Sequence, residues 1–263
     1  MIVEQIWTGN TLRNFNYLVA CPESGEALAI DPLDFKKCLT TAAERGWTIT
    51  QVLNTHEHGD HTGGNKGVIS ATGATLIAHH NAFDRIANID RGVGAGDIIK
   101  VGKTVELECL DTPGHTMCHI CLLSRTDQPA LFSGDTMFNA GAGNCHNGGH
   151  PEELFETFEQ QLQRIGDDTL LYPGHDYLLH NLRFTLDREP DNSAAAAMLA
   201  QYAGQDPDEA LVTTMAQEKN INTFFRLQSP SVIEKLVQEF PEIGDSPDAK
   251  AVFLKLRELR NSW

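Results

Sequence analysis

The segment Thr55-His56-Glu57-His58-Gly59-Asp60-His61 constrains this chain more than any other stretch of its sequence. Three imidazoles and the carboxylate of Asp60 fall within six residues, directly after the apolar strand predicted at Gln51 to Asn54. A loop at a strand end can turn consecutive side chains inward, whereas a regular strand alternates them. Because a divalent transition metal needs several such donors converging within bonding distance, this histidine-rich loop (residues 55–61) predicts a metal site.

Three further potential ligands stand alone later in the chain, each after a predicted strand and each next to a glycine. They are His115 in Thr112-Pro113-Gly114-His115, Asp135 in Ser133-Gly134-Asp135-Thr136, and His175 in Tyr172-Pro173-Gly174-His175. Glycine before the donor allows a sharp turn that projects the side chain from the strand end. Together with the histidine-rich loop they make seven donors, which is enough for two metal ions that share one carboxylate.

The first part of the chain alternates short apolar runs with helical patterns, which is typical of a layered α/β fold. Strands are expected at 17–20, 27–30, 51–54, 75–78, 105–110, 119–123, 130–132 and 169–172, and helices at 35–45 and 152–165. After Tyr177 the patterns are helical, with helices expected at 194–202, 231–239 and 249–260. We therefore expect two domains, formed by residues 1–176 and 177–263.

Charge and hydropathy exclude several classes of protein. Lys and Arg number 20 against 36 Asp and Glu, so the formal charge of −16 has the wrong sign for nucleic acid or an anionic membrane. No stretch approaches the roughly 18 apolar residues of a spanning helix, and the N-terminal residues do not resemble a secretory signal. Six cysteines are too sparse for a disulfide scaffold and fit a reducing compartment. We expect a cytoplasmic protein that binds a small molecule, without nucleic-acid, membrane or obligate protein partners.

The donor elements, in this order, resemble the metallo-β-lactamase superfamily, whose αββα sandwich holds a binuclear metal site at the sheet edges. The Thr-His-x-His-x-Asp-His loop and the later Gly-His, Gly-Asp-Thr and Gly-His elements carry the resemblance over most of the first 176 residues. It implies an α/β fold, a four-layer αββα sandwich followed by a smaller all-helical C-terminal domain. It also implies two metal sites, the first held by His56, His58 and His115, the second by Asp60, His61 and His175, with Asp135 bridging the two.

The sequence is further similar to one family within that superfamily, glyoxalase II, also called hydroxyacylglutathione hydrolase. The matching segments are Asp111 to Thr116, Phe132 to Phe138, Gly174 to Tyr177 followed by Asn181-Leu182, and Asn222 to Arg226 in the helical tail. This resemblance covers nearly the whole chain and implies a binuclear metal-dependent thioester hydrolase that cleaves S-lactoylglutathione to lactate and glutathione. Zinc is the expected metal, with iron and manganese as alternatives, because His and Asp donors accept all three.

Such a site suggests a hydrolysis without a serine or cysteine nucleophile. Two ions that share Asp135 would bridge a water and lower its pKa, so that hydroxide is available to attack the thioester carbonyl. A thiolate leaving group, with a pKa of about 8.5 to 9, needs little protonation. The catalytic residues that the resemblance implies are therefore Asp60 and Asp135, acting with the hydroxide, and no serine stands in a Gly-x-Ser-x-Gly elbow.

The resemblance also implies a glutathione-binding region, which this chain matches in part. Tyr177 follows the Gly-His-x element, and Arg257 and Arg260 lie on one face of a predicted helix, where both can meet one carboxylate. Ordinary surface cations near a helix end are the alternative for the two arginines. Where family members commonly carry a basic residue and an aromatic pair, this chain has Asn144 and His146, so both are candidate substrate-binding residues. Losing the cation would weaken glutathione binding by about one or two kcal/mol.

Three alternatives to the leading function stay open. The changes at Asn144 and His146 allow another thioester or a lactone as the substrate. A mono-iron persulfide dioxygenase would use only part of the donor set. A protein that retains the fold but only binds a metal or a partner is the third, although none of the seven donors is missing.

Several other polar residues have structural explanations. Asp31 is expected either to accept an imidazole N–H or a loop amide, or to begin a turn before Pro32. His79, His80 and His180 are expected at the surface or as satisfied core residues, whereas His146 and His150 are left open. Cys118 and Cys121 have metal-binding spacing, but no second pair completes a four-thiolate site, and all six cysteines are expected to be structural or incidental.

Overall fold

The computed structural model describes residues 1–126 and 128–263. The chain forms two compact units. The first comprises Met1–Thr112, Cys118–Gly134 and Tyr172–Asp176, and the second comprises Pro113–Met117, Asp135–Leu171 and Tyr177–Trp263. The chain therefore passes from one unit to the other close to His115, Asp135 and His175.

The first unit contains a mixed six-stranded sheet in the order of the sequence. Its strands are β1 (Ile2–Trp7), β2 (Phe15–Ala20), β3 (Glu26–Ile30), β4 (Thr48–Leu53), β5 (Thr75–His79) and β6 (Arg91–Val93). The first three run antiparallel, and β3 to β6 run parallel. All six residues of β2 are buried, as expected for a strand covered on both faces, whereas the edge strand β1 buries only Ile6.

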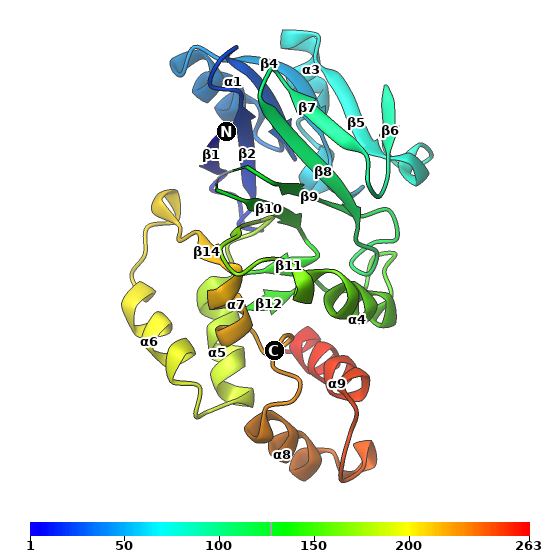
Figure 1. Cartoon of the computed structure of the whole chain (residues 1–263), viewed down its shortest axis with the longest axis vertical. Helices are drawn as coiled ribbons and strands as arrows, with labels where there is room; N and C mark the ends of the chain where they lie inside the picture. Colours follow the sequence, from blue (N-terminus) through cyan, green and yellow to red (C-terminus); the bar gives the residue numbers. More distant parts are fainter. Residues whose placement is uncertain (127) are drawn as a thin grey trace. The chain divides into compact units, whose positions relative to one another are not determined.

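Helices cover one face of this sheet (Figure 1). They are α1 (Phe35–Glu44) and α3 (Asn65–Thr72), and the short helices α2 (Gly59–Thr62) and η1 (His80–Ala82) belong to the same unit. Asp34 begins α1 by accepting the backbone N–H of Lys37, and Gly73, with a φ of 71°, ends α3. Cys38 and Val68 pack with strand residues in one apolar core, which fixes both helices against the sheet.

A second sheet of the first unit faces the other side of the mixed sheet. It contains the antiparallel strands β7 (Ile98–Val101), β8 (Val105–Asp111), β9 (Ile120–Ser124) and β10 (Ala130–Gly134), together with the last two residues of β13 (Leu170–Pro173). The Tyr17 ring lies 5.6 Å from Phe132 and 5.5 Å from Tyr172 between ring centroids, and the Tyr17 hydroxyl donates to the Pro173 carbonyl at 2.6 Å. This unit is therefore a layer of helices on two packed sheets.

The second unit is mainly helical. Its helices are α4 (Pro151–Gln160), α5 (Leu178–Arg188), α6 (Ser193–Tyr202), α7 (Met215–Ile221), α8 (Pro230–Glu239) and α9 (Ala249–Asn261), with the short turns η2 (Leu162–Arg164), η3 (Pro207–Glu209) and η4 (Pro241–Ile243). A small hairpin joins β11 (Met137–Phe138) to β12 (Gly141–Ala142), and β14 (Thr213–Thr214) pairs with Leu170 and Leu171. The rings of Phe158, Phe224 and Phe253 pack at centroid distances of 5.1 to 6.2 Å and form an aromatic core.

The sequence predicted most of these elements. The expected strands correspond to β2, β3, β4, β5, β8, β9, β10 and β13, and the later helices to α6, α8 and α9. The helix expected over 152–165 ends earlier, because the chain breaks at Gln161 into α4 and η2. The two-residue strand β14 interrupts the helical region, since so short a strand has no periodic pattern. Among the described residues, no helix is long and apolar enough to cross a membrane.

A buried glutamate on α7 holds the hairpin of the second unit. Glu218 is fully buried, and its carboxylate accepts the Thr213 hydroxyl at 2.6 Å and the Ala140 backbone N–H at 2.7 Å. Ala140 has a φ of 54°, which is strained for a residue other than glycine. Burial raises the pKa of Glu218 to about 7, although these hydrogen bonds oppose the shift. The carboxyl group therefore binds its proton more tightly in the folded chain than in the unfolded one.

This difference predicts a pH-dependent stability that Glu218→Gln removes. Between about pH 4.5 and 7 the folded state binds more protons than the unfolded state, so rising pH lowers the free energy of unfolding through Glu218. The wild type should lose up to about 3 kcal/mol relative to Glu218→Gln across this window. Urea unfolding at pH 5 and pH 8 measures the change, and Glu209→Gln, at an exposed position, is the control. The prediction would be contradicted if the wild type and Glu218→Gln differed in free energy of unfolding by the same amount at both pH values.

Candidate metal centre

The carboxylate of Asp31 organises the histidine-rich loop. Asp31 follows β3 with a φ of 47°, and its side chain is buried. One carboxylate oxygen accepts the backbone N–H of Thr55 at 2.8 Å, and the other accepts the Thr55 hydroxyl at 2.6 Å and lies 2.9 Å from His61 Nδ1. The expectation that Asp31 accepts an imidazole N–H or a loop amide is confirmed, since its carboxylate accepts both.

These hydrogen bonds set the protonation pattern of His56. Because the Thr55 hydroxyl gives its hydrogen to Asp31, its oxygen is left to accept from His56 Nδ1, 3.0 Å away. The His56 proton therefore lies on Nδ1, and Nε2 carries a lone pair. His56 Nε2 lies 3.1 Å from His58 Nδ1, so the two rings direct ring nitrogens at one position.

A second group of donors consists of Asp60, His61 and His175, all in the first unit. His61 Nδ1 donates to the Asp31 carboxylate, and His175 Nδ1 donates to the Leu12 carbonyl at 2.7 Å. Both rings therefore carry their lone pairs on Nε2, and these two Nε2 atoms lie 3.2 Å apart. Asp60 Oδ2 lies 3.6 Å from His61 Nε2 and 3.5 Å from His175 Nε2.

These distances fit a cation. Three electron-pair donors that face one another repel unless a positive charge lies among them. Ligand bonds of about 2.0 to 2.1 Å at tetrahedral angles place neighbouring donor atoms about 3.3 Å apart, close to the separations found here. The group of Asp60, His61 and His175 is therefore suited to a divalent metal ion.

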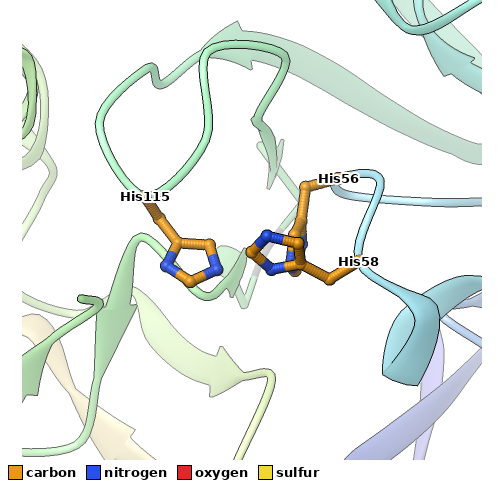
Figure 2. A group of neighbouring side chains, drawn as sticks. All are labelled: His56, His58 and His115. Carbon is orange, nitrogen blue, oxygen red and sulfur yellow. The ribbon is translucent and has the colours of Figure 1, made fainter. Parts of the chain in front are cut away.

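The first predicted set of ligands also includes His115. Figure 2 shows His56, His58 and His115 as neighbouring side chains, and each offers one ring nitrogen within 4.8 Å of the others. His56 and His58 come from the histidine-rich loop, and His115 comes from the turn between β8 and β9. Within the second unit, His115 Nδ1 lies 2.6 Å from the Asn144 carbonyl, so that Nδ1 donates, and its Nε2 lies 3.5 Å from Asp135 Oδ2.

Glycine is required where the chain leads into Asp135. Gly134 has a φ of 47°, and a Cβ atom there would lie 2.6 Å from Thr55 Oγ1 and 2.7 Å from His119 Nε2. The Gly134 carbonyl accepts the N–H of Gly174 at 2.8 Å. Asp135 and His175 are the residues that follow these two glycines along the chain.

His119 contacts the predicted ligand His56, and the sequence did not single it out. It is buried, its Nδ1 lies 2.9 Å from the Thr112 hydroxyl, and its ring stacks on His56 at a centroid distance of 5.1 Å. The sequence placed it only within the Cys118-to-Cys121 segment and a predicted strand, which gives no signal for this role. Cys118 and Cys121 donate to the Asn81 and Ser133 carbonyls, and all six cysteines are free thiols, in agreement with their expected structural role.

His79, His80 and His180 lie as the sequence suggested, at the surface or as hydrogen-bonded buried residues. His79 is buried, accepts the Asn81 N–H at 3.1 Å, and has a lowered pKa because of its burial. His80 Nδ1 lies 3.1 Å from the Val93 carbonyl, and His180 is exposed. His146 is exposed, and His150 is an exposed residue that precedes α4.

The predicted substrate-binding residues all lie in the second unit. Asn144 and His146 are exposed, and Tyr177 packs its half-buried ring on Phe138 at 5.1 Å. Arg257 is buried and donates to the Ala142 and Gly143 carbonyls at 2.6 and 3.0 Å.

The two arginines of α9 differ in their contacts. Burial lowers the pKa of Arg257 to about 10, and its guanidinium lies 5.6 Å from the Phe224 ring centroid. Arg260 is half-buried and donates twice to Asn181 Oδ1, at 2.9 and 3.1 Å. Arg257 thus holds the loop that contains Asn144, whose carbonyl accepts the His115 N–H, whereas Arg260 lies nearer to solvent.

Comparisons with known proteins agree with this architecture. Residues 20–175 match the family model described as "Metallo-beta-lactamase superfamily", and residues 176–263 match "Hydroxyacylglutathione hydrolase C-terminus". The chain is 70% identical over 263 residues to a hydroxyacylglutathione hydrolase of Polaromonas sp. (strain JS666 / ATCC BAA-500), and 61% identical over 263 residues to one of Nitrosococcus oceani, with full coverage of both chains in each case. Among solved structures it is similar to ETHE1 from Myxococcus xanthus, with a TM-score of 0.68, 25% identity, and coverage of 100% of this chain and 99% of that one.

The central place of Asp31 predicts a metal-binding defect in Asp31→Asn. An amide nitrogen in place of Oδ2 would face the Thr55 hydroxyl and His61 Nδ1, which both donate to it in the wild type. Metal affinity should fall about 10- to 100-fold, the usual effect of losing an acceptor that orients ligand histidines. Competition with a chelator measures this affinity, and Asp34→Asn, which loses the same charge at the start of α1, should bind metal like the wild type. A folded Asp31→Asn protein with wild-type metal affinity would refute the role given to this carboxylate.

Proposed function

Because the chain belongs to the hydroxyacylglutathione hydrolase family of the metallo-β-lactamase superfamily, we propose that it hydrolyses S-lactoylglutathione to lactate and glutathione with two divalent metal ions. The observation that carries the proposal is the convergence of lone pairs on Asp60, His61 and His175, beside a second set that includes His56 and His58. A chain that only retained the fold would have no need to keep both sets of donors.

We assign His56, His58 and His115 to the first ion, Asp60, His61 and His175 to the second, and Asp135 to both. Bound there, the ions would lower the pKa of a water molecule and polarise the thioester carbonyl. The chain itself fixes the histidine tautomers, through Asp31 for His56 and His61, through Leu12 for His175 and through Asn144 for His115. Asp60 and Asp135 supply the negative charge that holds two cations close together.

The glutathione part of the substrate is assigned to the second unit. Arg260 on α9, which lies nearer to solvent, supplies positive charge for its carboxylates by direct pairing, and the buried Arg257 adds positive charge from behind the Asn144 loop. Tyr177 supplies an aromatic surface. Asn144 and His146 stand where the resemblance to glyoxalase II leads us to expect a cation and an aromatic residue, and both are exposed. These two changes are the reason to keep another thioester, or a lactone, as the second candidate substrate.

Metal identity, cellular location and domain division belong to the same proposal. Zinc is the metal we propose, with iron or manganese as the other candidates for a site of His and Asp donors. A cytoplasmic location is supported by six free thiols. A division into a metal-binding domain, 1–176, and a substrate-binding domain, 177–263, is supported by the residues at which the two family models meet.

The proposed activity predicts thiol release from S-lactoylglutathione. Purified protein should release free thiol, lose this activity when a chelator removes the metal, and regain it on addition of zinc. Elemental analysis should give about two ions per chain. If the protein with both metal ions bound is inactive on this thioester yet hydrolyses another thioester or a lactone in the same panel, the substrate assignment is wrong. That result would also identify the alternative substrate. One iron per chain with oxygen consumption on glutathione persulfide would favour a dioxygenase instead.

The bridging role of Asp135 predicts that Asp135→Asn loses metal and activity together. The amide supplies one neutral acceptor in place of a charged carboxylate, so it cannot balance two cations. Metal content should fall to about one ion or fewer per chain, and thioester cleavage should fall at least 100-fold. Asp167→Asn, at an exposed position, is the control for the lost charge. Retained cleavage with two bound ions in Asp135→Asn would exclude a bridging role.

A further inference from the structure

A buried asparagine outside the seven donors touches the second group of ligands. Asn14 precedes β2 and has no exposed surface. Its side-chain nitrogen donates to Asp60 Oδ2 at 3.1 Å and to the Asp60 backbone carbonyl at 3.1 Å, and it lies 3.4 Å from His175 Nε2. The Asn14 amide thus lies beside two of the three donors proposed for the second ion.

The orientation of this amide is fixed by its other contacts. Asn14 Oδ1 accepts from Asn10 Nδ2 at 2.7 Å, which identifies the oxygen end and places the two amide hydrogens toward Asp60. The Asn14 backbone donates to Asn10 Oδ1 at 3.0 Å and forms an isolated bridge with His175. The amide is therefore held on both sides and cannot turn away without breaking these partly buried hydrogen bonds.

Asp60 needs such a partner more than His61 and His175 do. It lies on α2, a helix of four residues, and its side chain is 25% exposed, whereas the side chains of His61 and His175 are 0% and 4% exposed. Without a hydrogen bond, a carboxylate on so short an element is free to rotate toward water. A neutral amide donor restrains it without adding a positive charge that would repel a metal ion, as lysine or arginine would.

We propose that Asn14 is a positioning residue, which holds the Asp60 carboxylate in the orientation that binds the second metal ion. This inference rests on the two-ion site of the proposed function. The hydrogen bond to Oδ2 takes one lone pair and leaves the carboxylate able to bind a cation with the rest. In the described part of the chain, Asn14 contacts Asp60 and His175 but neither His56 nor His58. Its loss therefore weakens binding of the second ion selectively.

The test measures metal affinity without substrate in Asn14→Ala and Asn14→Leu. The alanine variant removes the amide, and the leucine variant removes it while keeping the buried volume. Zinc per chain is followed against increasing chelator, and Co²⁺ absorption is recorded after metal exchange. One of the two ions should bind at least tenfold more weakly than in the wild type, with the other unchanged. In steady-state kinetics, kcat should fall more than KM changes.

Asn10→Ala is the graded comparison, because it keeps the Asn14 amide and its hydrogen bonds to Asp60 but removes the contact that orients this amide. It should weaken binding of the second ion less than Asn14→Ala does and leave the first ion unchanged. Thermal unfolding identifies folded variants, and the leucine variant provides the measurement if the alanine variant does not fold. Equal weakening of both ions, an equal loss in Asn10→Ala, or wild-type affinity in a folded Asn14 variant would overturn the inference. A wild type that binds two ions but does not cleave S-lactoylglutathione would refute the substrate and leave the role of Asn14 standing.

Discussion

The hydrogen bonds of one buried carboxylate, that of Asp31, support the remainder of the metal centre. Its oxygens take hydrogens from Thr55 and His61, which are 24 and 30 residues further along the chain. Through the Thr55 hydroxyl the same carboxylate determines which nitrogen of His56 carries the proton. One acceptor at the end of β3 therefore directs a ligand of each proposed ion, and the parallel arrangement of β3 and β4 brings it there. Neutral imidazoles with correctly placed lone pairs are what a cation requires, so these hydrogen bonds orient the donors as a metal ion would need them.

In the second unit, an acceptor from another segment orients His115 in the same way. Its acceptor, the Asn144 carbonyl, follows a hairpin that several buried side chains hold in place. Glu218 accepts the N–H of Ala140, and Arg257 donates to the carbonyls of Ala142 and Gly143. Helices α7 and α9 thus stabilise a loop that presents no ligand of its own. Within the second unit these helices therefore position the backbone carbonyl that orients His115, in addition to the substrate contacts proposed for α9.

Much of the candidate site could be predicted because metal donors have few alternative uses in clusters. The histidine-rich loop and the glycine-flanked His115, Asp135 and His175 are local patterns, and their chemistry follows from residue type. Asn14 and His119 could not be predicted in this way. Asparagine and histidine are common residues, and only the fold brings Asn14 next to Asp60, 46 residues away, and stacks His119 on His56.

The sequence by itself determined the donor set, the α/β order of the first 176 residues and the helical character of the tail, because side-chain periodicity and ligand chemistry are local properties. Tertiary structure alone decided which nitrogen of each histidine faces the metal position, since that depends on acceptors such as Asp31, Leu12 and Asn144 from other segments. It also decided that Arg257 lies buried against backbone carbonyls while Arg260, three residues on, lies nearer to solvent. A helical spacing gives both arginines the same face, but only the packing around that face determines how much of each guanidinium water can reach.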